Sequence, residues 1–229
     1  MAIPELRRRM DALPGWLTYE EGEALYELAR ECTGRGVIVE IGSWRGKSTT
    51  CLGLGSKAGN RVPVYAVDRH TEGTFPDFRA NVAAADIQEL VLPIRGLSQE
   101  VVADFHEPIE LLFIDGAHQF ELVKQDWERW VPKVVEGGVV AMHDTTGFPG
   151  VRRVAEEEMY KSPRFKDVRF VFNTMTVGRK AREMTASDRI RNRFALGVMR
   201  SVVAARALGR RRVPKPLLRA GRRVMRAIQ

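Results

Sequence analysis

Five short apolar runs, separated by segments of helical periodicity, restrict the fold of this chain more than any other sequence feature. The runs are GVIVEI at 36–41, VYAVD at 64–68, LVLPI at 90–94, ELLFID at 110–115 and GVVAMHD at 138–144. Helices are predicted near 47–56, 76–85, 119–131 and 150–161, and a shorter helix begins at Ser98. Continuous apolar strands that alternate with helices are typical of a parallel sheet covered on both faces. The pattern therefore predicts a doubly wound, mostly parallel α/β fold.

Two details indicate the order of the strands. Pro93 lies inside the third run and cannot donate a ladder hydrogen bond, so the third strand should lie at an edge of the sheet. An edge position agrees with the doubly wound order 3-2-1-4-5. Two adjoining strands at 168–179 have too short a connection for a crossover. One of them should therefore be antiparallel to the rest.

The formal net charge of +8 is concentrated at the C-terminal end. Residues 181–229 hold fourteen Lys/Arg and two acids, whereas residues 1–180 hold twenty-three basic and twenty-seven acidic residues. We divide the chain into an N-terminal helical segment at 1–34, a main domain at 35–180 and a basic, partly helical tail at 181–229. Because the main domain is acidic overall, no DNA partner is expected.

Part of the tail is predicted to form a basic amphipathic helix. Ile190, Phe194, Val198 and Val202 recur there at helical spacing among arginines. Such a helix is suited to weak contact with an anionic surface. The simpler alternative is a solvated basic segment.

The location of the protein is predicted from features that the sequence lacks. The chain has no run of about eighteen apolar residues that could cross a membrane, and its start, MAIPELRRRMDALPG, does not resemble a signal peptide. Cys32 and Cys51 have no metal-ligand spacing and are expected to be buried, reduced thiols. A cytoplasmic protein is therefore expected.

The segment VEIGSWRGKST at 39–49 forms the first strand-to-helix turn, where α/β folds bind nucleotides. Its glycine spacing differs from that of the dinucleotide pattern G-x-G-x-x-G. Glu40 is unsuited to a phosphate, but it suits a ligand that carries an ammonium group or a positive sulfur. Asp68 ends the second strand, where an acid can accept hydrogen bonds from ribose hydroxyls. An ordinary βα turn and a capping aspartate are the alternative, although the residues together favour a nucleoside site.

Acids and histidines follow the fourth and fifth strands. Asp115 and Asp144 end these strands, His118 follows Asp115 by three residues, and His143 directly precedes Asp144. Because the carboxyl ends of neighbouring parallel strands share one edge, these groups should lie close together. Two acids with an imidazole suit Mg²⁺ or Mn²⁺ better than Zn²⁺. Alternatively, Asp115 caps the next helix and both histidines are structural.

The series VEIGSWRGKST, VYAVD, LLFIDGAHQF with Asp126, and EGGVVAMHD resembles the class I S-adenosylmethionine-dependent methyltransferases. Within that class it is similar to metal-dependent O-methyltransferases related to the macrocin and mycinamicin sugar methyltransferases and to the cephalosporin-hydroxylase-like group. The likeness covers roughly residues 35–180. A looser likeness, in size and motif layout, is to the 1-O-methyltransferases of methylmannose polysaccharide synthesis. The resemblance implies a seven-stranded sheet in the order 3-2-1-4-5-7-6, with the last inserted strand antiparallel.

The resemblance also implies where the cofactor S-adenosylmethionine lies. Glu40 and Gly42 would lie near its methionine part, Asp68 on its ribose, and Ser98 and Gln99 near its adenine. The predicted cofactor-binding residues are Glu40, Gly42, Ser43, Gly46, Ser48, Asp68, Ser98, Gln99 and Asp115.

In the related sugar O-methyltransferases, the metal ligands are the acid after strand four and two adjacent acids after strand five. The base is a histidine three residues after the first acid. Carried over, Asp115 and Asp144 bind Mg²⁺ or Mn²⁺ and His118 is the catalytic base. His143 stands where the relatives carry a carboxylate, so it is either a third, neutral ligand or a second base. The implied acceptor is a small molecule or an oligosaccharide, and the implied assembly is a homodimer.

Three other activities have to be distinguished from sugar O-methylation. A catechol or phenol O-methyltransferase would use the same site with an aromatic acceptor. An RNA methyltransferase is suggested by the arginine-rich tail, but the signature of amino-group methylation is absent. A nicotinamide-dependent oxidoreductase is disfavoured by the glycine spacing. Asp126 is equally consistent with a supporting role at the site and with a solvated helix face, whereas Trp127 and Trp130 are expected to be core residues.

Overall fold

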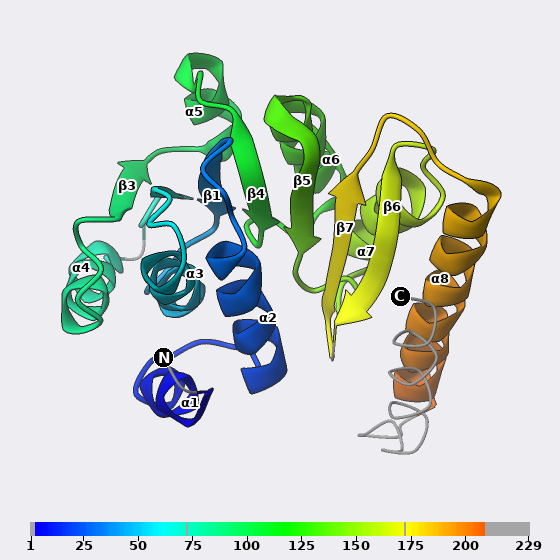
Figure 1. Cartoon of the computed structure of the whole chain (residues 1–229). Coiled ribbons are helices and arrows are strands. Elements are labelled where there is room, and N and C mark those ends of the chain that lie inside the picture. The colour runs from blue at the N-terminus through cyan, green and yellow to red at the C-terminus, as the bar shows by residue number, and fades with distance from the viewer. Residues whose placement is uncertain (1–2, 72, 172, 209–229) are drawn as a thin grey trace.

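The computed structural model describes residues 3–71, 73–171 and 173–208. Its centre is a seven-stranded sheet in the order β3-β2-β1-β4-β5-β7-β6 (Figure 1), which confirms the predicted fold class and strand order. The strands are β1 (Val37–Ile41), β2 (Val64–Asp68), β3 (Val91–Arg95), β4 (Ile109–Ile114), β5 (Val134–Met142), β6 (Phe165–Val171) and β7 (Met175–Lys180). Strands β1 to β5 pair in parallel, and β7 is antiparallel to both β5 and β6.

Pro93 lies on β3, at the edge of the sheet, where its missing N–H leaves no ladder bond unmade. The fifth strand is longer than its apolar run, because it begins at Val134 and contains Gly137 in a left-handed conformation (φ +77°). The pairing of β4 with β5 shifts register over the same stretch. The additional residues of β5 were missed because an irregularity in the strand at Gly137 interrupts the apolar pattern.

Helices cover both faces of the sheet. They are α1 (Ile3–Asp11), α2 (Tyr19–Arg30), α3 (Lys47–Ala58), α4 (Phe75–Ala84), α5 (Ser98–Asp104), α6 (Phe120–Trp130), α7 (Pro149–Ala155) and α8 (Ala186–Ala207). A single 3₁₀ turn (Val131–Lys133) follows α6, and α7 continues as a π-helical turn (Glu156–Tyr160). Helix α2 begins with a capping box, in which Thr18 and Glu21 satisfy each other's backbone N–H groups.

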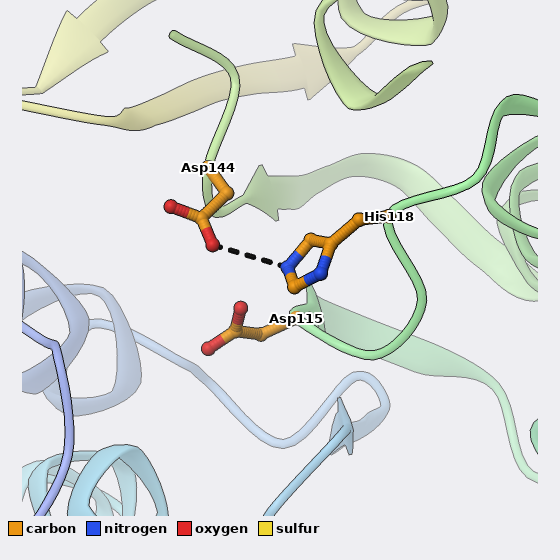
Figure 2. A group of neighbouring side chains, drawn as sticks. All are labelled: Asp115, His118 and Asp144. Carbon is orange, nitrogen blue, oxygen red and sulfur yellow. Dashed lines mark hydrogen bonds and ion pairs between the residues drawn. The ribbon is translucent and has the colours of Figure 1, made fainter. Parts of the chain in front are cut away.

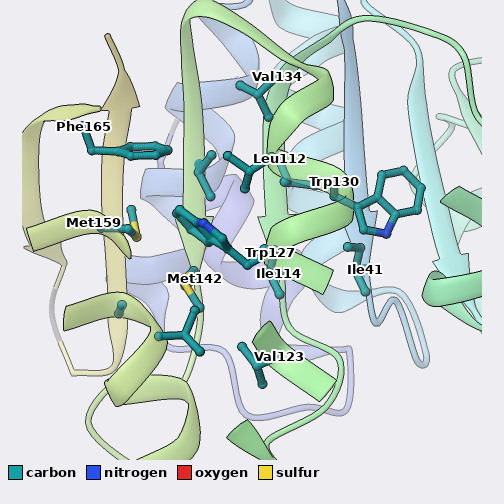
Figure 3. Packing of buried hydrophobic residues seen from close by; sticks show 14 of the residues in the cluster. Ile41, Leu112, Ile114, Val123, Trp127, Trp130, Val134, Met142, Met159 and Phe165 are labelled. Carbon is teal, nitrogen blue, oxygen red and sulfur yellow. The ribbon is translucent and has the colours of Figure 1, made fainter. Parts of the chain in front are cut away.

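Two hydrophobic cores lie on opposite faces of the sheet because successive strand residues point in opposite directions. On β4, Leu111 and Phe113 pack against helices α1 to α4, whereas Leu112 and Ile114 pack against helices α5 to α8. Figure 3 shows the second core, in which the side chains of Trp127 and Trp130 lie among sheet residues. Both tryptophans are buried, as predicted, and truncating such a side chain to alanine costs about 3–5 kcal/mol. Both cysteines are also free and buried.

Helix α8 packs beside β6 with a side that the sequence pattern did not identify. The sequence pattern placed Ile190, Phe194, Val198 and Val202 on one apolar face, but only Val202 is buried, while Ile190 and Phe194 are exposed. Residues at three successive steps of four drift around a helix with 3.6 residues per turn, and Asn192 decides which side faces the sheet. Its side chain accepts from the Val168 N–H and donates to the Phe165 carbonyl. No helix in the described part of the chain is long and apolar enough to cross a membrane.

Candidate functional site

A cavity of about 820 Å³ opens at the carboxyl ends of β1, β2, β4 and β5. This is the edge at which open α/β sheets bind ligands, because the loops that leave neighbouring strands diverge there. Its walls include most of the residues singled out from the sequence. These are Gly42, Ser43, Ser48, Asp68, Ser98, Gln99, Asp115, His118, Asp126, His143 and Asp144.

The loop between β1 and α3 depends on two glycines. Gly42 has a left-handed backbone (φ +91°), and a Cβ atom there would lie 2.3 Å from the Asp115 carbonyl oxygen. Gly46 is also left-handed (φ +84°) and precedes the first turn of α3. Within this loop, the buried hydroxyl of Ser43 faces the cavity and has no hydrogen-bond partner among the described residues. A buried polar atom without a partner is suited to a ligand group.

Glu40 lies behind this loop and is fully buried. Its carboxylate accepts hydrogen bonds from the hydroxyls of Ser48 and Thr49, and Ser48 lines the cavity. Burial raises the pKa of Glu40 to about 8, although the two hydroxyls oppose the rise. Within the described part of the chain, Glu40 therefore has hydroxyl partners and no ion pair, and a positive charge in the cavity would favour its ionised form.

Asp68 ends β2 with both carboxylate oxygens directed at backbone groups. One oxygen accepts from the Trp44 N–H (2.8 Å) and the other from the His70 N–H (2.6 Å). These bonds hold the carboxylate in one orientation at the cavity wall. The Trp44 N–H reaches Asp68 from a left-handed conformation (φ +42°), which is uncommon for a bulky residue and indicates local strain at the site.

Ser98 and Gln99 begin α5 on the same wall. Both side chains donate to one oxygen of Asp126, at 2.5 Å and 2.7 Å. Burial raises the pKa of Asp126 to about 6, and the two donors oppose that rise. Asp126 is buried beside the cavity, so of its two possible roles the supporting one agrees with the geometry.

Asp115, His118 and Asp144 meet at the ends of β4 and β5 (Figure 2). Their candidate ligand atoms all lie within 4.8 Å of one another. His118 Nε2 lies 3.1 Å from Asp144 Oδ2, and 38% of the His118 side chain is exposed. Burial raises the pKa of Asp115. Burial also opposes ionisation of Asp144, but hydrogen bonds from His118 and His143 outweigh it and lower the Asp144 pKa.

His143 is enclosed by carboxylates and only 5% of its side chain is exposed. Its Nδ1 lies 3.0 Å from Asp115 Oδ1, and its Nε2 lies 3.4 Å from Glu21 Oε2 on helix α2. Since ionised carboxylates only accept, both ring nitrogens must donate. Burial disfavours the charged ring, but the neighbouring acids, Asp115 foremost, raise the pKa of His143 to about 12.

This geometry bears on the expected metal ligand at position 143. A doubly protonated imidazole has no lone pair to give to a metal or to accept a proton. His143 directs its two ring nitrogens at Asp115 and Glu21, and the candidate ligand atoms that lie within 4.8 Å of one another belong to Asp115, His118 and Asp144. The sequence predicted the proximity of all four residues, but it gave no sign of Glu21 as the partner of His143.

Aromatic side chains form the mouth of the cavity. Trp16 is 82% exposed and packs on Trp44 with ring centroids 5.1 Å apart. Phe148 stacks on the His118 ring at 3.9 Å, nearly in parallel. Neither Trp16 nor Phe148 was predicted as a site residue, and both lie in loops where the sequence offers no periodicity to identify them. Glu40 and Gly46, which were predicted, support the cavity from behind and do not line it.

Comparisons with known proteins agree with this arrangement. Residues 39–145 match the sequence profile of a family described as a methyltransferase domain. The uncharacterized protein y4gI of Sinorhizobium fredii (strain NBRC 101917 / NGR234) is 30% identical over 117 residues. That alignment covers 47% of this chain but only 13% of the relative.

Solved structures share the fold at low sequence identity. The O-methyltransferase NovP has a TM-score of 0.63 and 17% identity, over 78% of this chain and 88% of that chain. An O-methyltransferase from Bacillus cereus, solved in complex with SAH, has a TM-score of 0.57 and 19% identity, over 78% and 90%. Cofactor-bound Rv0187 from MTB has a TM-score of 0.60 and 18% identity, over 80% and 90%.

The domain matched by residues 39–145 is described as a methyltransferase domain, and the order of the seven strands is that of an α/β methyltransferase fold. The chain shares this fold with solved O-methyltransferases, one of which was determined in complex with SAH. The cavity lies at the carboxyl ends of the strands, where open α/β sheets bind their ligands.

Proposed function

We propose that this protein transfers a methyl group from S-adenosylmethionine to a hydroxyl group of a sugar, with help from Mg²⁺ or Mn²⁺. The observation that carries the proposal is the meeting of Asp115, His118 and Asp144 at the cavity that Glu40, Gly42 and Asp68 support. One half of the cavity is suited to a positively charged nucleoside, and the other half is suited to deprotonating a hydroxyl.

The cofactor half fits on electrostatic grounds. S-adenosylmethionine carries an ammonium group and a sulfonium, and Glu40 is a buried acid that lacks a cation. The unpartnered hydroxyl of Ser43 would form a hydrogen bond with the methionine part of S-adenosylmethionine, either as donor or as acceptor. The carboxylate of Asp68, held by two backbone N–H groups, remains oriented for ribose hydroxyls.

The donor set at the other half fits a hard divalent cation. Asp115 and Asp144 supply oxygen ligands, which Mg²⁺ and Mn²⁺ prefer, and the lowered pKa of Asp144 keeps it ionised. When bound, such an ion polarises the acceptor hydroxyl and fixes its position. His118 is close enough to join this ligand set, but its partial exposure and its bond to Asp144 favour proton transfer.

His118 would act as the general base. If Asp144 accepts from His118 Nε2–H, the neutral ring keeps the lone pair of Nδ1 for a proton. The acceptor O–H bond breaks as its proton passes to Nδ1. The new O–CH₃ bond forms as the S–CH₃ bond breaks, so S-adenosylhomocysteine leaves with the sulfur electron pair. Phe148, stacked on His118, restricts the ring to one plane.

A sugar acceptor is supported by the resemblance of the motifs and by the flat aromatic faces of Trp16 and Phe148 at the mouth of the cavity. The same faces also suit an aromatic ring, so a catechol or phenol acceptor is the second candidate function. A screen of glycosides and catechols with radiolabelled S-adenosylmethionine distinguishes the two. Methylation of catechols alone would contradict a sugar acceptor, but it would still agree with the proposed methyl transfer to a hydroxyl group.

A variant of His118, compared with a variant of a control histidine, tests the mechanism. We expect His118→Ala to lower kcat by about 10²–10⁴-fold, the usual contribution of a general base. His106→Ala, at an exposed histidine outside the cavity, is the matched control. Calorimetric titration of Mg²⁺ into the protein without substrate shows whether His118 acts as a general base or as a metal ligand. If His118→Ala retains its affinity for Mg²⁺, the role of His118 as a base is supported. If the affinity for Mg²⁺ is lost, His118 is a metal ligand.

Variants of the acids test the cation. Asp144→Ala should lose both Mg²⁺ affinity and turnover, because Asp144 is proposed to bind the ion and to orient His118. Asp77→Ala, at an exposed carboxylate on α4, should change neither. Full activity in EDTA would remove the ion from the mechanism, while leaving the His118 test valid.

A further inference from the structure

Helix α8 presents an apolar stripe to solvent. Ile190, Phe194 and Leu208 are 69%, 41% and 77% exposed, respectively. With the small exposed residues Gly197, Ser201 and Ala204 they follow one line along the helix, at spacings of three and four residues. The helix of 22 residues is about 33 Å long, so the stripe extends along most of one side of the molecule.

The stripe faces outward because the opposite side of α8 is fixed. Asn192 makes two hydrogen bonds with β6, and Ala195, Leu196 and Met199 join the core. At the C-terminal end, Arg206 donates to the Thr146 hydroxyl (2.6 Å) and to the Asn173 side chain. A rotation that buried Ile190 and Phe194 would break these bonds and leave Asn192 exposed.

Positive charge flanks the stripe. Arg189 and Arg193 are exposed on α8, and neither forms an ion pair within residues 3–71, 73–171 and 173–208. Arg191 and Arg200, by contrast, pair with Asp188 and Glu156. The sequence that follows, residues 209–229, contains eight Lys/Arg and no acid.

We propose that the exposed stripe of α8 docks on the surface of an anionic lipid bilayer. Aliphatic and aromatic side chains flanked by arginines are typical of helices that lie in a membrane interface. Ile190, Phe194 and Leu208 would enter the headgroup region, and Arg189 and Arg193 would contact the anionic headgroups. The proposal does not depend on which acceptor the enzyme methylates.

Charge distinguishes a bilayer from two other occupants. A second copy of the chain would cover the aliphatic residues of the stripe, but the stripe of that copy contains no acid that could pair with Arg189 and Arg193. A nucleic acid would attract the arginines, but it would leave the aliphatic residues Ile190 and Leu208 without a role. Only an anionic bilayer offers partners for both kinds of side chain.

Vesicle sedimentation with the full chain tests the proposal. We expect binding to vesicles that contain phosphatidylglycerol and much weaker binding to pure phosphatidylcholine. Ile190→Ser with Phe194→Ser should remove most of the binding, whereas Leu92→Ser, at a residue 43% exposed on edge strand β3, should not. Arg193→Glu should weaken partitioning at least about fivefold, the usual effect of one cation near an anionic surface. Arg79→Glu, an exposed charge on α4, is its control.

A chain that ends at residue 208 separates α8 from the residues after it. Preferential binding of this shorter chain to phosphatidylglycerol vesicles supports the stripe. Loss of all binding in the shorter chain would overturn the proposal, as would full binding by the Ile190→Ser/Phe194→Ser variant. Two further outcomes would also overturn it: binding of single-stranded RNA with the same dependence on Phe194, or conversion of a dimer to a monomer by the stripe variant. Unchanged thermal unfolding of the variants shows that their fold is intact.

Discussion

Two glutamates are fully buried at the ends of the same sheet, and they differ in their partners. Glu21, on helix α2, accepts from Thr174 and contacts the ring of His143. Glu40, on β1, has only the hydroxyls of Ser48 and Thr49 as side-chain partners among the residues that the structure describes. Burial opposes ionisation of both, but His143 and the hydrogen bonds lower the pKa of Glu21, whereas the pKa of Glu40 rises to about 8.

The difference separates a structural carboxylate from one that is suited to a ligand. A buried carboxylate is costly unless a cation or several donors compensate for lost hydration. The fold supplies Glu21 with a cation in His143, but it supplies none to Glu40. We therefore expect the counter-charge of Glu40 to come from the cofactor, and the predictions below test this contrast.

The largest effect on stability should come from removing the cation of Glu21. His143→Leu leaves Glu21 and Asp115 buried without a positive partner. We expect a loss of about 3–5 kcal/mol in the free energy of unfolding, measured with urea. His106→Leu, at an exposed histidine, is the control. A loss below about 1 kcal/mol would show that His143 is not the partner of Glu21.

Glu40 should make the protein without ligand less stable as the pH rises. Its pKa in the fold is about 8 instead of 4.5, so the folded state retains a proton that the unfolded state has lost. The stabilisation is complete below pH 4.5 and is lost as the pH rises through 8, at up to about 1.4 kcal/mol per pH unit. Urea unfolding of Glu40→Gln should show a flatter dependence, and exposed Glu31→Gln should behave as the original chain.

Cofactor binding should release a proton from Glu40. A cation in the cavity lowers the pKa of this acid, so affinity for S-adenosylmethionine should rise with pH by at most about tenfold per unit below pH 8. Calorimetry at pH 7 in two buffers of different ionisation enthalpy measures the proton directly. Glu40→Gln should bind more weakly and release no proton from this position. Equal proton release by both proteins would assign the effect to another group.

The smallest effect is expected for Glu21→Gln. The amide keeps the shape and one acceptor oxygen, so the bonds from Thr174 can persist, and the cost should be about 1–3 kcal/mol. Combined with His143→Leu, it should destabilise less than the sum of the two single changes, because the pair is then removed together. Simple additivity in urea unfolding would contradict a direct interaction between the two side chains.

Much of the fold was predictable because its determinants are local or periodic. Apolar runs identified the strands, Pro93 indicated the edge, and the short link before β7 required an antiparallel strand. The acids of the site were predictable for a related reason. Asp115 and Asp144 end neighbouring parallel strands, so the sheet order itself brings them together.

The roles of the two histidines required the tertiary structure. His118 follows Asp115 by three residues and His143 directly precedes Asp144, but His118 faces the open cavity and His143 is enclosed. The enclosure depends on Glu21, which is 122 residues away from His143 and looks in the sequence like a helix cap alone. No local pattern encodes a contact between a helix end and a distant strand end.

The sequence by itself determined the strand segments, the edge position of the third strand, the glycines of the first loop and the acids at the strand ends, because each follows from backbone geometry along a short segment. Only the tertiary structure decided which buried glutamate has a cation and which side of α8 faces solvent. These choices depend on side chains such as His143 and Asn192, which find partners on other elements. Tertiary packing brings such partners together, and a periodic pattern within one segment cannot predict contacts with residues of another segment.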